Sequence, residues 1–258
     1  MKYIASCSFG KDSLAQIIQI KKLGLPLDEV IYCDILFSAS PRISGEHPLM
    51  AQWIPTAERI LEKEFGIKVK HITAKKSFVE QFYTEKSKGK HLGEIYGFPY
   101  TLGAWCNSRL KLDPIAQYIS SINDKVYQYV GIAYDEPDRY RRLKQNETNK
   151  IEYGSVLFDN QITEQMAFDI CAEYNLVSPV YSSDSFRGGC WFCVKQCIAD
   201  LYILWKDYPE YFEMLLQLEK DSPVSFKPNS TISEYARRFE HGYIPPRRKK
   251  RNEQQNYA

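Results

Sequence analysis

The stretch Lys2-Tyr-Ile-Ala-Ser-Cys-Ser-Phe-Gly-Lys-Asp-Ser13 decides the fold of this chain. Its first six residues predict a short strand, and the residues from 12 to 23 predict a helix because apolar side chains recur at helical spacing. Gly24 and Pro26 end that helix. The backbone N–H groups at a helix start are unpaired and carry partial positive charge, so together they bind phosphate. The turn between strand and helix therefore predicts an anion site.

The turn residues suit phosphate chemistry individually. Gly10 permits a tight turn and the close approach of an anion, and Lys11 adds a positive charge. The hydroxyls of Ser8 and Ser13 can donate hydrogen bonds, while Asp12 fits if it binds Mg²⁺ or orients a donor. The alternative is an ordinary strand-to-helix turn in which Asp12 or Ser13 caps the helix.

Strands and helices alternate beyond this turn. Further strands are predicted at residues 29–36, 67–72 and 126–132, with helices near 50–65, 76–86 and 111–121 between them. The stretches from Pro41 to Pro48 and from 88 to 105 read as loops. This order predicts an α/β, Rossmann-like parallel sheet with helices on both faces.

The last third of the chain changes character. Residues 162–174 predict a helix that starts at Thr163-Glu164, and the chain is helical again from Ile198, with breaks at Pro209 and Ser222-Pro223. We therefore expect a nucleotide-binding α/β domain over residues 1–180, a Cys-rich helical extension over 181–244 and a basic, disordered tail over 245–258.

Composition bounds the class of protein. The 258 residues are 44% hydrophobic and 26% charged, with a net charge of +2, which is ordinary for a soluble globular protein. No apolar run is long enough to cross a membrane and no secretory signal is evident, so we expect a cytoplasmic protein with no membrane partner. Thiols stay reduced there, so the seven cysteines are expected to hold metal or to be buried rather than to form disulfides.

Ser8-Phe9-Gly10-Lys11-Asp12-Ser13 resembles the PP-loop, S-x-G-x-D-S, of the adenine nucleotide alpha hydrolase superfamily, and it is neither a Walker A loop nor a G-x-G-x-x-G loop. The resemblance implies binding of ATP, with Mg²⁺, or of an adenylyl sulfate. It also implies cleavage of ATP between its α- and β-phosphates, and contacts to the nucleotide from Ser8, Phe9, Gly10, Lys11, Asp12 and Ser13.

Three later segments resemble sulfonucleotide (PAPS and APS) reductases, in the order those enzymes have them. They are Trp105 to Ile115, then Gly131 to Glu136 with Arg139, Arg141 and Arg142, and lastly Ser178 to Cys193, which includes Arg187-Gly-Gly-Cys. The chain is therefore similar to the PAPS reductase family. Asp34 and Gly131 each lie at the end of a predicted strand, and we expect them to contact the nucleotide together with the loop residues. The catalytic set expected from charge is Asp12, Lys111, Arg139 and Arg142.

The cysteines form a second signature. Cys190 and Cys193 form a C-x-x-C motif, Cys197 follows four residues later, and Cys106 lies in the first segment of the resemblance. Four thiolates suit either a [4Fe-4S] cluster or structural zinc. The resemblance favours the cluster, because APS-type reductases hold one with a Cys pair and a distant C-x-x-C; free or redox-active thiols are the third alternative.

The reaction expected is ATP cleavage that adenylates an acceptor, with sulfur transfer to a nucleic acid or small molecule as one outcome. Residues 198–258 contain no cysteine, so the C-terminal nucleophile of a sulfonucleotide reductase is missing. Two alternatives stay open: a PAPS or APS reductase that uses a thiol from Cys197 or from a partner, and a non-catalytic module that binds nucleotide or nucleic acid. The basic run Arg247 to Arg251 motivates a nucleic-acid partner. A sulfur donor protein and a second copy of the chain, in a homodimer, are the other partners considered.

Overall fold

The structure is a computed structural model that describes residues 1–182 and 188–246. The chain forms two compact units. The first contains residues 1–34, 49–74 and 111–179, and the second contains 35–48, 75–110 and the chain from 180 onward. The sequence-based division at residue 180 coincides with the last of these boundaries. The two earlier segments of the second unit lie inside the expected first domain.

A five-stranded parallel sheet forms the centre of the first unit, as predicted. Its strand order is β5-β2-β1-β6-β7, and every neighbouring pair is parallel. The strands are β1 (Lys2–Cys7), β2 (Glu29–Asp34), β5 (Val69–Thr73), β6 (Val126–Val130) and β7 (Ile151–Gly154). Strands buried on both faces read as continuous apolar runs, which is why β1 and β2 were recognisable.

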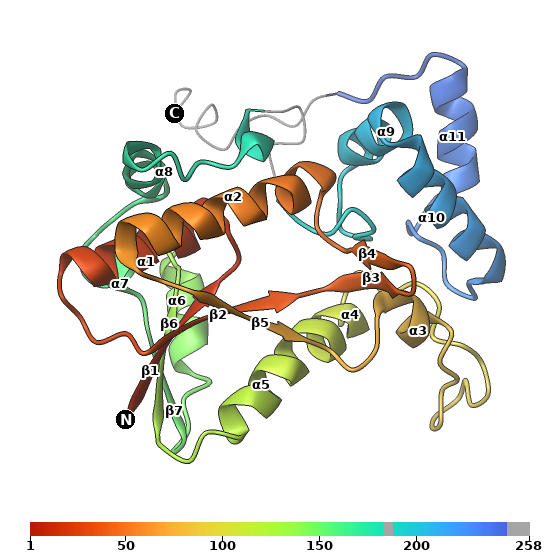
Figure 1. Ribbon diagram of the computed structural model, residues 1–258. Helices are drawn as coiled ribbons and strands as arrows, with labels where there is room; N and C mark the ends of the chain where they lie inside the picture. The colour runs from red at the N-terminus through yellow and green to blue at the C-terminus, as the bar shows by residue number, and fades with distance from the viewer. Residues whose placement is uncertain (183–187, 247–258) are drawn as a thin grey trace. The chain divides into compact units, whose positions relative to one another are not determined.

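Helices cover both faces of this sheet, so the α/β class is confirmed. In Figure 1, α1 (Lys11–Lys22) and α2 (Pro48–Phe65) lie on one side of the sheet and α5 (Asp113–Ser120) lies on the other. Apolar side chains of the strands and of α5 form a core that includes Ile4, Ile31 and Ile119. On the opposite face α1 buries Leu14, Ile17 and Ile18, and α8 (Glu164–Glu173) and α7 (Val156–Asp159) pack against it. The remaining helix of this unit is α6 (Pro137–Lys144), which contacts β7.

The strand order has one reversal. From β1 the chain moves outward through β2 to β5, then returns to the other side of β1 with β6 and β7. Open parallel sheets bind ligands outside the carboxyl ends of the strands at such a point. The loops that follow β1 and β6 therefore define where a ligand is expected.

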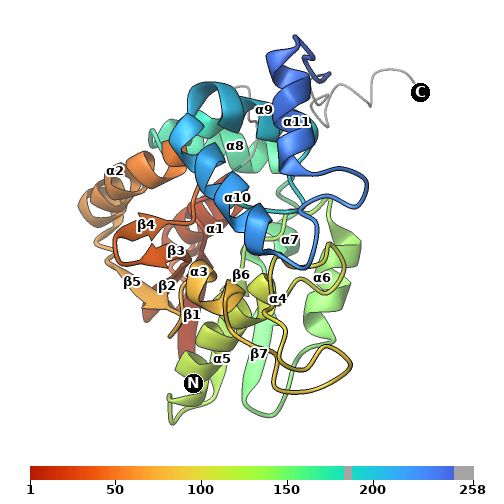
Figure 2. The same ribbon diagram turned by 90° about the vertical axis from the view of Figure 1, so that its right-hand side faces the viewer.

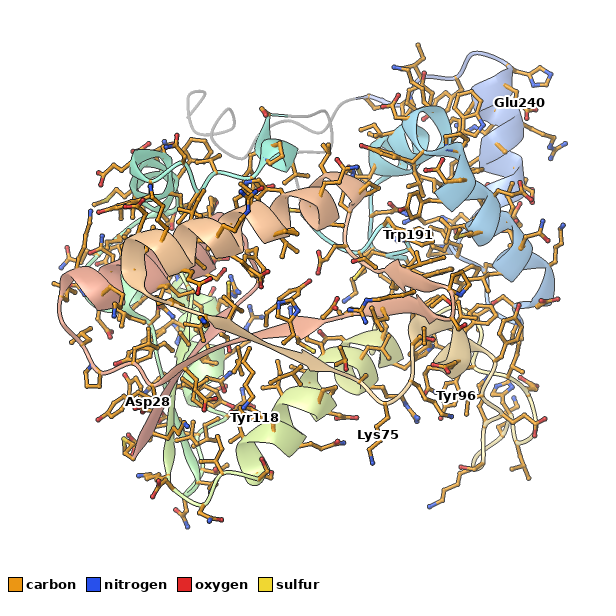
Figure 3. The ribbon with its side chains drawn as sticks, viewed as in Figure 1. Asp28, Lys75, Tyr96, Tyr118, Trp191 and Glu240 are labelled. Atoms are coloured by element: carbon orange, nitrogen blue, oxygen red, sulfur yellow. The ribbon has the colours of Figure 1, made fainter. Side chains whose placement is uncertain are left out.

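The second unit is built around aromatic side chains. Phe37 lies 5.9 Å from Phe78 and 4.4 Å from Trp191 between ring centroids, and Phe192 lies 4.1 Å from Phe78. Trp191 is labelled in Figure 3, where it lies beside the β-hairpin. The elements are β3 (Leu36–Ala39), β4 (Arg42–Ser44), α3 (Phe78–Phe82), α4 (Trp105–Asn107), a 3₁₀ turn (Pro179–Tyr181), α9 (Ile198–Asp207), α10 (Pro209–Asp221) and α11 (Ile232–Glu240); a π-helical turn (Ser108–Leu112) leads into α5.

Several predicted elements differ from the structure. The strand predicted over 29–36 ends at Asp34, and the loop expected up to Pro48 contains the β3–β4 hairpin, which forms because Phe37 is buried against Phe78. The helix predicted over 76–86 spans only Phe78–Phe82. The strand β7 and the helices α6 and α7 were not predicted, since β7 is a short edge strand with little apolar periodicity. The helix predicted over 162–174 is confirmed as α8, with Thr163 as its N-cap.

None of the helices within residues 1–182 and 188–246 is both long and apolar enough to span a membrane. The basic tail expected from residue 245 lies outside the described residues from 247 onward, and so does Arg187.

A charged network joins β1, β2 and α5 and yields a test of the fold. The Lys2 ammonium donates to Glu29 at 2.5 Å, the hydroxyl of Tyr118 (Figure 3) donates to the same carboxylate, and the Lys70 ammonium lies 3.7 Å from it. Burial by itself raises the pKa of Glu29, but the bonds from Lys2 and Tyr118 outweigh it and hold this pKa below its ordinary value of 4.5.

We expect Glu29→Gln to lower the free energy of unfolding by about 1 kcal/mol at neutral pH. Because the folded-state pKa is lowered, this contribution is present above pH 4.5 and is lost as the pH falls through the lowered value. Thermal unfolding from pH 7 to pH 3 measures it. Glu62→Gln, at an exposed pair with Lys68, is the control and should change little. A loss of unfolding free energy in Glu29→Gln that does not change with pH would contradict the prediction.

Candidate functional site

The start of α1 lacks a side-chain cap. Its N-cap residue is Gly10, which makes no side-chain hydrogen bond, so the alternative in which Asp12 or Ser13 caps the helix is wrong. The first intrahelical bond of the turn runs from the Leu14 N–H to the Gly10 carbonyl at 3.1 Å. Within the described residues, the N–H groups of Asp12 and Ser13 donate to no backbone or side-chain acceptor. These groups are available to an anion.

Hydrogen bonds inside the loop keep it in this conformation. The Ser13 hydroxyl donates to the Gly10 carbonyl at 2.9 Å and accepts from the Ser8 N–H at 3.1 Å. Phe9 has a positive φ of 54°, which non-glycine residues rarely adopt. Its ring is fully buried and packs 5.0 Å from the ring of Tyr32. Phe9 therefore anchors the loop, and its ring is not exposed for contact with a ligand.

Lys11 lies among carboxylates. Its ammonium is 2.7 Å from Asp12 and 3.5 Å from Glu164. Burial raises the pKa of Asp12, the charge and hydrogen bond of Lys11 lower it in part, and Glu164 and Glu136 raise it further, so that it stays above its ordinary value. A phosphate that arrived here would give Lys11 a new partner, and the carboxylates would favour a bound cation.

Gly131 brings the end of β6 against the first turn of α1. A Cβ atom at this residue would lie 2.7 Å from the carbonyl carbon of Asp12 and 2.7 Å from the nitrogen of Ser13, both backbone atoms. Only a glycine allows this approach. The sequence placed Gly131 with the loop, and the structure brings the two together at the reversal of the strand order.

The other predicted residues lie at differing distances from the loop. Arg139 forms an ion pair of 2.7 Å with Glu136, and the charge of Glu136 raises the pKa of Asp12. Arg139 therefore lies near the loop. Asp34 is buried at the end of β2, the neighbouring strand. Lys111 and Arg142 are exposed, and in the described ranges neither forms a hydrogen bond or ion pair with the loop.

A buried polar pair behind the loop was not predicted. The Gln16 side-chain oxygen accepts from the Ser155 hydroxyl and from the Val156 N–H, both at 3.1 Å. The Ser155 hydroxyl also accepts from the Ile132 N–H at 3.2 Å. These bonds tie α1 to the end of β6 and to α7, so they fix Gly131 relative to the loop. The one signal in the sequence was a glutamine among the apolar residues of the first helix.

Two further cysteines lie at the loop or beside it. The Cys171 thiol, on α8, donates to the Lys11 carbonyl at 3.2 Å. Burial raises its pKa to about 12, and it does the same for Cys7 at the end of β1. Both thiols are therefore protonated and poorly nucleophilic at neutral pH.

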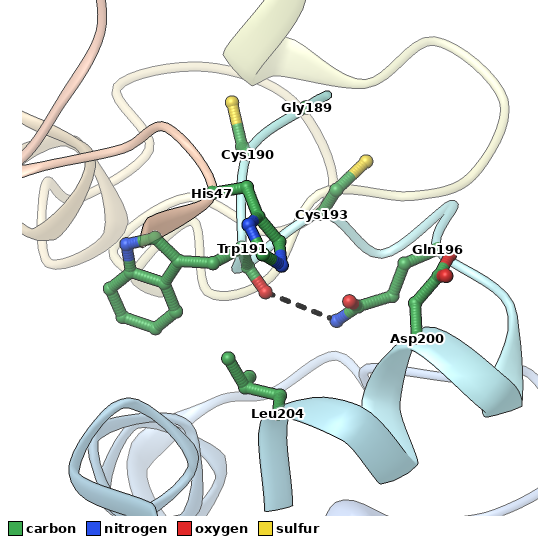
Figure 4. A pocket seen from close by; sticks show the side chains of 8 residues that line it. All are labelled: His47, Gly189, Cys190, Trp191, Cys193, Gln196, Asp200 and Leu204. Atoms are coloured by element: carbon green, nitrogen blue, oxygen red, sulfur yellow. Dashed lines mark hydrogen bonds between the residues drawn. The ribbon is translucent and has the colours of Figure 1, made fainter. Parts of the chain in front are cut away.

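The predicted metal ligands all belong to the second unit. Cys190 and Cys193 lie on a turn in which the Cys193 N–H donates to the Cys190 carbonyl at 3.1 Å. Trp191 between them donates its indole N–H to Ser44 at 2.8 Å and its backbone N–H to Gly45 at 3.1 Å, which holds the turn on the hairpin. In Figure 4 the sulfurs of both cysteines point away from Leu204.

Cys106 and Cys197 lie near this turn without completing a ligand set. Burial, and then the charge of Cys193, raise the pKa of Cys106 to about 11. Cys197 is the N-cap of α9, and its backbone N–H donates to the Asp200 carboxylate at 3.2 Å. Residues 1–182 and 188–246 contain no group of three or more His, Cys, Asp or Glu side chains placed to hold a metal ion.

Two polar residues near the cysteines were missed by the sequence analysis. His47 lines a small cavity of about 50 Å³ with Cys190, Cys193 and Asp200 (Figure 4). Burial lowers the pKa of His47 and the charge of Asp200 opposes this only in part, so the imidazole is neutral at pH 7. Lys227 is buried, and its ammonium donates to the Val194 carbonyl at 2.5 Å and to the Gln196 carbonyl. Neither residue lies in a recognisable motif.

Comparisons with known proteins identify no family. No protein-family model matches the chain. The chain is 31% identical over 114 residues to the uncharacterized nin region protein ORF290 of Escherichia phage lambda, a match that spans 43% of this chain and 36% of that relative. Among solved structures, it is similar to the U34-tRNA thiolase NcsA from Methanococcus maripaludis, a structure with a [4Fe-4S] cluster. The identity is 17% and the TM-score 0.43, over 95% of this chain and 74% of that one.

The contact at Gly131 is open to a direct test. Gly131→Ala should displace the first turn of α1, because the added methyl would meet backbone atoms at 2.7 Å. We expect a lower melting temperature and at least tenfold weaker binding of ATP, measured by calorimetry. Gly189→Ala is the matched control, since a Cβ there meets no atom within 4 Å. Unchanged ATP affinity in the Gly131 variant would show that the loop is not the nucleotide site.

Proposed function

We propose that this chain is a PP-loop ATP pyrophosphatase, which cleaves ATP between the α- and β-phosphates and adenylates an acceptor. One observation carries the proposal: the uncapped start of α1, with the N–H groups of Asp12 and Ser13 unpaired in the described structure, meets Gly131 where the strand order reverses. Oriented N–H groups and a helix dipole at this edge of a parallel sheet favour a nucleotide phosphate.

The loop is suited to hold the leaving group. The N–H groups of Asp12 and Ser13 and the hydroxyl of Ser8 can donate to the β- and γ-phosphates, while Lys11 neutralises their charge. In the reaction, an acceptor oxygen forms a bond to the α-phosphorus, the bond from that phosphorus to the bridging oxygen breaks, and pyrophosphate leaves with the electron pair. Such a step depends mostly on positioning and electrostatics.

The remaining catalytic candidates would act on the α-phosphate. Arg139 is connected to the loop through Glu136 and can exchange its ion pair for a phosphate oxygen. Lys111 lies in the π-helical turn before α5 and Arg142 lies on α6, and both are exposed. We propose that they contact the nucleotide once it is bound. Asp34, buried at the end of β2, is proposed to contact the ribose or nucleotide-bound Mg²⁺.

Asp12 fits a role with Mg²⁺. This ion commonly binds one or two carboxylates together with substrate phosphates. Asp12 is largely buried beside Glu136 and Glu164, and its raised pKa reflects a negative charge that lacks full compensation. When bound, Mg²⁺ would neutralise charge on the phosphates that leave.

The thiols support adenylyl transfer over sulfonucleotide reduction. A reductase needs a thiolate that can reach the substrate sulfur. Cys7 and Cys171 are the thiols beside the loop described above, and burial raises the pKa of each to about 12. Neither suits the role. A reductase activity would therefore have to use another thiol, from Cys197 or from a partner protein.

The cysteines of the second unit are proposed to hold a [4Fe-4S] cluster, with zinc as the alternative. The donor chemistry fits, because Cys106, Cys190, Cys193 and Cys197 belong to one compact unit and are each only half buried. Burial raises the pKa of Cys106 and of Cys197, so each thiol would have to lose its proton to bind a metal. A cluster would bind or carry sulfur, from a sulfur donor protein, for transfer to the adenylated acceptor.

The products of ATP turnover test the reaction. We expect α-labelled ATP to yield AMP and pyrophosphate, slowly with water as the acceptor. Ser13→Ala should weaken ATP binding about tenfold, because it removes the hydroxyl that bonds to the Gly10 carbonyl and to the Ser8 N–H and so holds the loop in its conformation. Ser120→Ala is the matched control, because the Ser120 hydroxyl donates to the Ala116 carbonyl within α5. Formation of ADP, or no binding of ATP by the unmodified chain, would refute the proposal.

Metal analysis tests the cysteine site separately. Protein purified without oxygen should contain iron and sulfide in equal amounts, with the visible absorption of a cluster. Cys190→Ser and Cys193→Ser should lose most of the iron and lower the melting temperature. Cys33→Ala, in the first unit, should keep the iron. One zinc per chain would favour the structural alternative, and metal-free protein in which Cys106, Cys190, Cys193 and Cys197 react freely would refute both.

A further inference from the structure

Lys227 is buried in the loop that joins α10 to α11 (Figure 2). Only 8% of its surface is exposed, and among the residues that the structure describes it is the only lysine or arginine in the interior. A buried ammonium is costly unless hydrogen bonds and a negative charge compensate it. The surroundings of Lys227 therefore indicate what the charge is for.

The turn between two of the cysteines holds the Lys227 ammonium. It donates to the carbonyl of Val194 at 2.5 Å and to that of Gln196. Val194 directly follows Cys193, and Gln196 directly precedes Cys197. Two carbonyls of the short segment between these cysteines are therefore turned toward one ammonium, and the shape of the segment depends on it.

Further hydrogen bonds continue this turn back to Cys190. The Gln196 N–H donates to the Cys193 carbonyl at 3.0 Å, and the Cys193 N–H donates to the Cys190 carbonyl at 3.1 Å. The Gln196 side chain also donates to the Trp191 carbonyl at 3.2 Å, as Figure 4 shows. The bonds from Lys227 thus act on the backbone that joins three of the four proposed metal ligands.

The same loop is attached to the stretch of chain that carries Cys106. Phe226 is only 1% exposed, and its ring lies 5.1 Å from that of Phe98 between centroids. The Ser222 hydroxyl accepts from the Phe98 N–H at 3.0 Å. Phe98 and Cys106 both belong to residues 75–110 of the second unit. The α10–α11 loop therefore contacts both stretches that supply cysteines, and this packing fixes the position of the lysine.

No carboxylate forms an ion pair with Lys227 within residues 1–182 and 188–246. Burial lowers the pKa of its ammonium, while the charges of Cys193, Cys197 and Asp200 raise it in part. The Asp200 carboxylate accepts from the Cys197 N–H at 3.2 Å, at the start of α9. The two cysteines are thus the groups near Lys227 that can gain negative charge when they bind a metal.

The charge of a metal centre with four thiolates complements that of a lysine. Such a centre is negative as a whole, whether it holds Zn²⁺ or a [4Fe-4S] core, because the thiolates outweigh the charge of the metal. A buried anion and a buried ammonium each become less costly when they lie close together. A residue that only held the two carbonyls would not need a charge, since a neutral N–H group donates to a carbonyl as well.

We propose that Lys227 is a positioning residue of the cysteine centre, which shapes the turn between Cys193 and Cys197 and compensates the charge of the metal-bound thiolates. The inference rests on the proposed cysteine centre and is independent of ATP cleavage. Net charge and hydrogen bonds around an iron–sulfur cluster set its reduction potential. The ammonium therefore favours uptake of an electron, because it stabilises the additional negative charge.

A metal titration of the full chain tests the support that Lys227 gives to the ligands. Metal-free protein is titrated with Co²⁺ in the absence of oxygen, and the absorption of the thiolate–cobalt bond is followed. Lys227→Met should bind Co²⁺ about tenfold more weakly, and Lys227→Arg, which keeps the charge, should recover most of the affinity. Lys220→Met is the matched control, because this exposed lysine of α10 donates to Gln217 at 2.9 Å, and it should bind like the unmodified chain.

The reduction potential gives a readout that a purely structural role would not change. Each protein is reconstituted with iron and sulfide, and the cluster is titrated with a reductant while its visible absorption is recorded. The potential of Lys227→Met should shift to a more negative value, because the positive charge beside the cluster is lost. The potentials of Lys227→Arg and Lys220→Met should stay close to that of the unmodified chain.

Two kinds of failure can be told apart. If Lys227→Met matches the unmodified chain in Co²⁺ affinity and in potential, the inference is overturned and the proposed cluster stands, even if the variant melts at a lower temperature. If the unmodified chain binds neither Co²⁺ nor iron and sulfide, the cysteine centre is refuted together with the inference. Should circular dichroism show that Lys227→Met is unfolded, Lys227→Gln, which keeps an N–H donor without the charge, replaces it and should show the same shift in potential.

Discussion

The contact between the end of β6 and the first turn of α1 is the constraint on which the rest of the first unit depends. Gly131 has no side chain, so its backbone lies against that of Asp12 and Ser13. Gln16 and Ser155 hold the two segments together from behind with buried hydrogen bonds. An uncapped helix start would normally acquire a cap or water, because unpaired N–H groups are costly. Here the surrounding structure keeps it uncapped, and its N–H groups are therefore available to the phosphate that we propose.

The charges around this turn show a balance between stability and function. Lys11 lies between Asp12 and Glu164, and burial keeps the pKa of Asp12 above its ordinary value. Such an arrangement costs folding free energy and is common at functional sites. A nucleotide with its Mg²⁺ would relieve it, since phosphate would pair with Lys11 and the cation with the carboxylate.

The second unit is assembled from three separate stretches of chain by aromatic packing. Phe37, Phe78 and Phe192 come from these different stretches, and their rings lie within 6 Å of a neighbour. Trp191 then attaches the cysteine turn to the β3–β4 hairpin through Ser44. Because the cysteines are held by tertiary contacts rather than by one helix or strand, their ligand set is a property of the unit as a whole.

By itself the sequence determined the parallel α/β sheet and the position of the loop between β1 and α1, because both are local. Buried parallel strands are continuous apolar runs, and the turn residues from Ser8 to Ser13 are adjacent in the chain. The same is true of α8, whose N-cap Thr163 was recognisable. Only the tertiary structure decided that Gly10 rather than Asp12 or Ser13 is the N-cap, and that Glu164 and Cys171 adjoin the loop. It also decided that residues 35–48 and 75–110 join the second unit, and that His47 and Lys227 lie at the cysteines. These features depend on contacts between residues far apart in the chain, and no local pattern of residue types encodes such contacts.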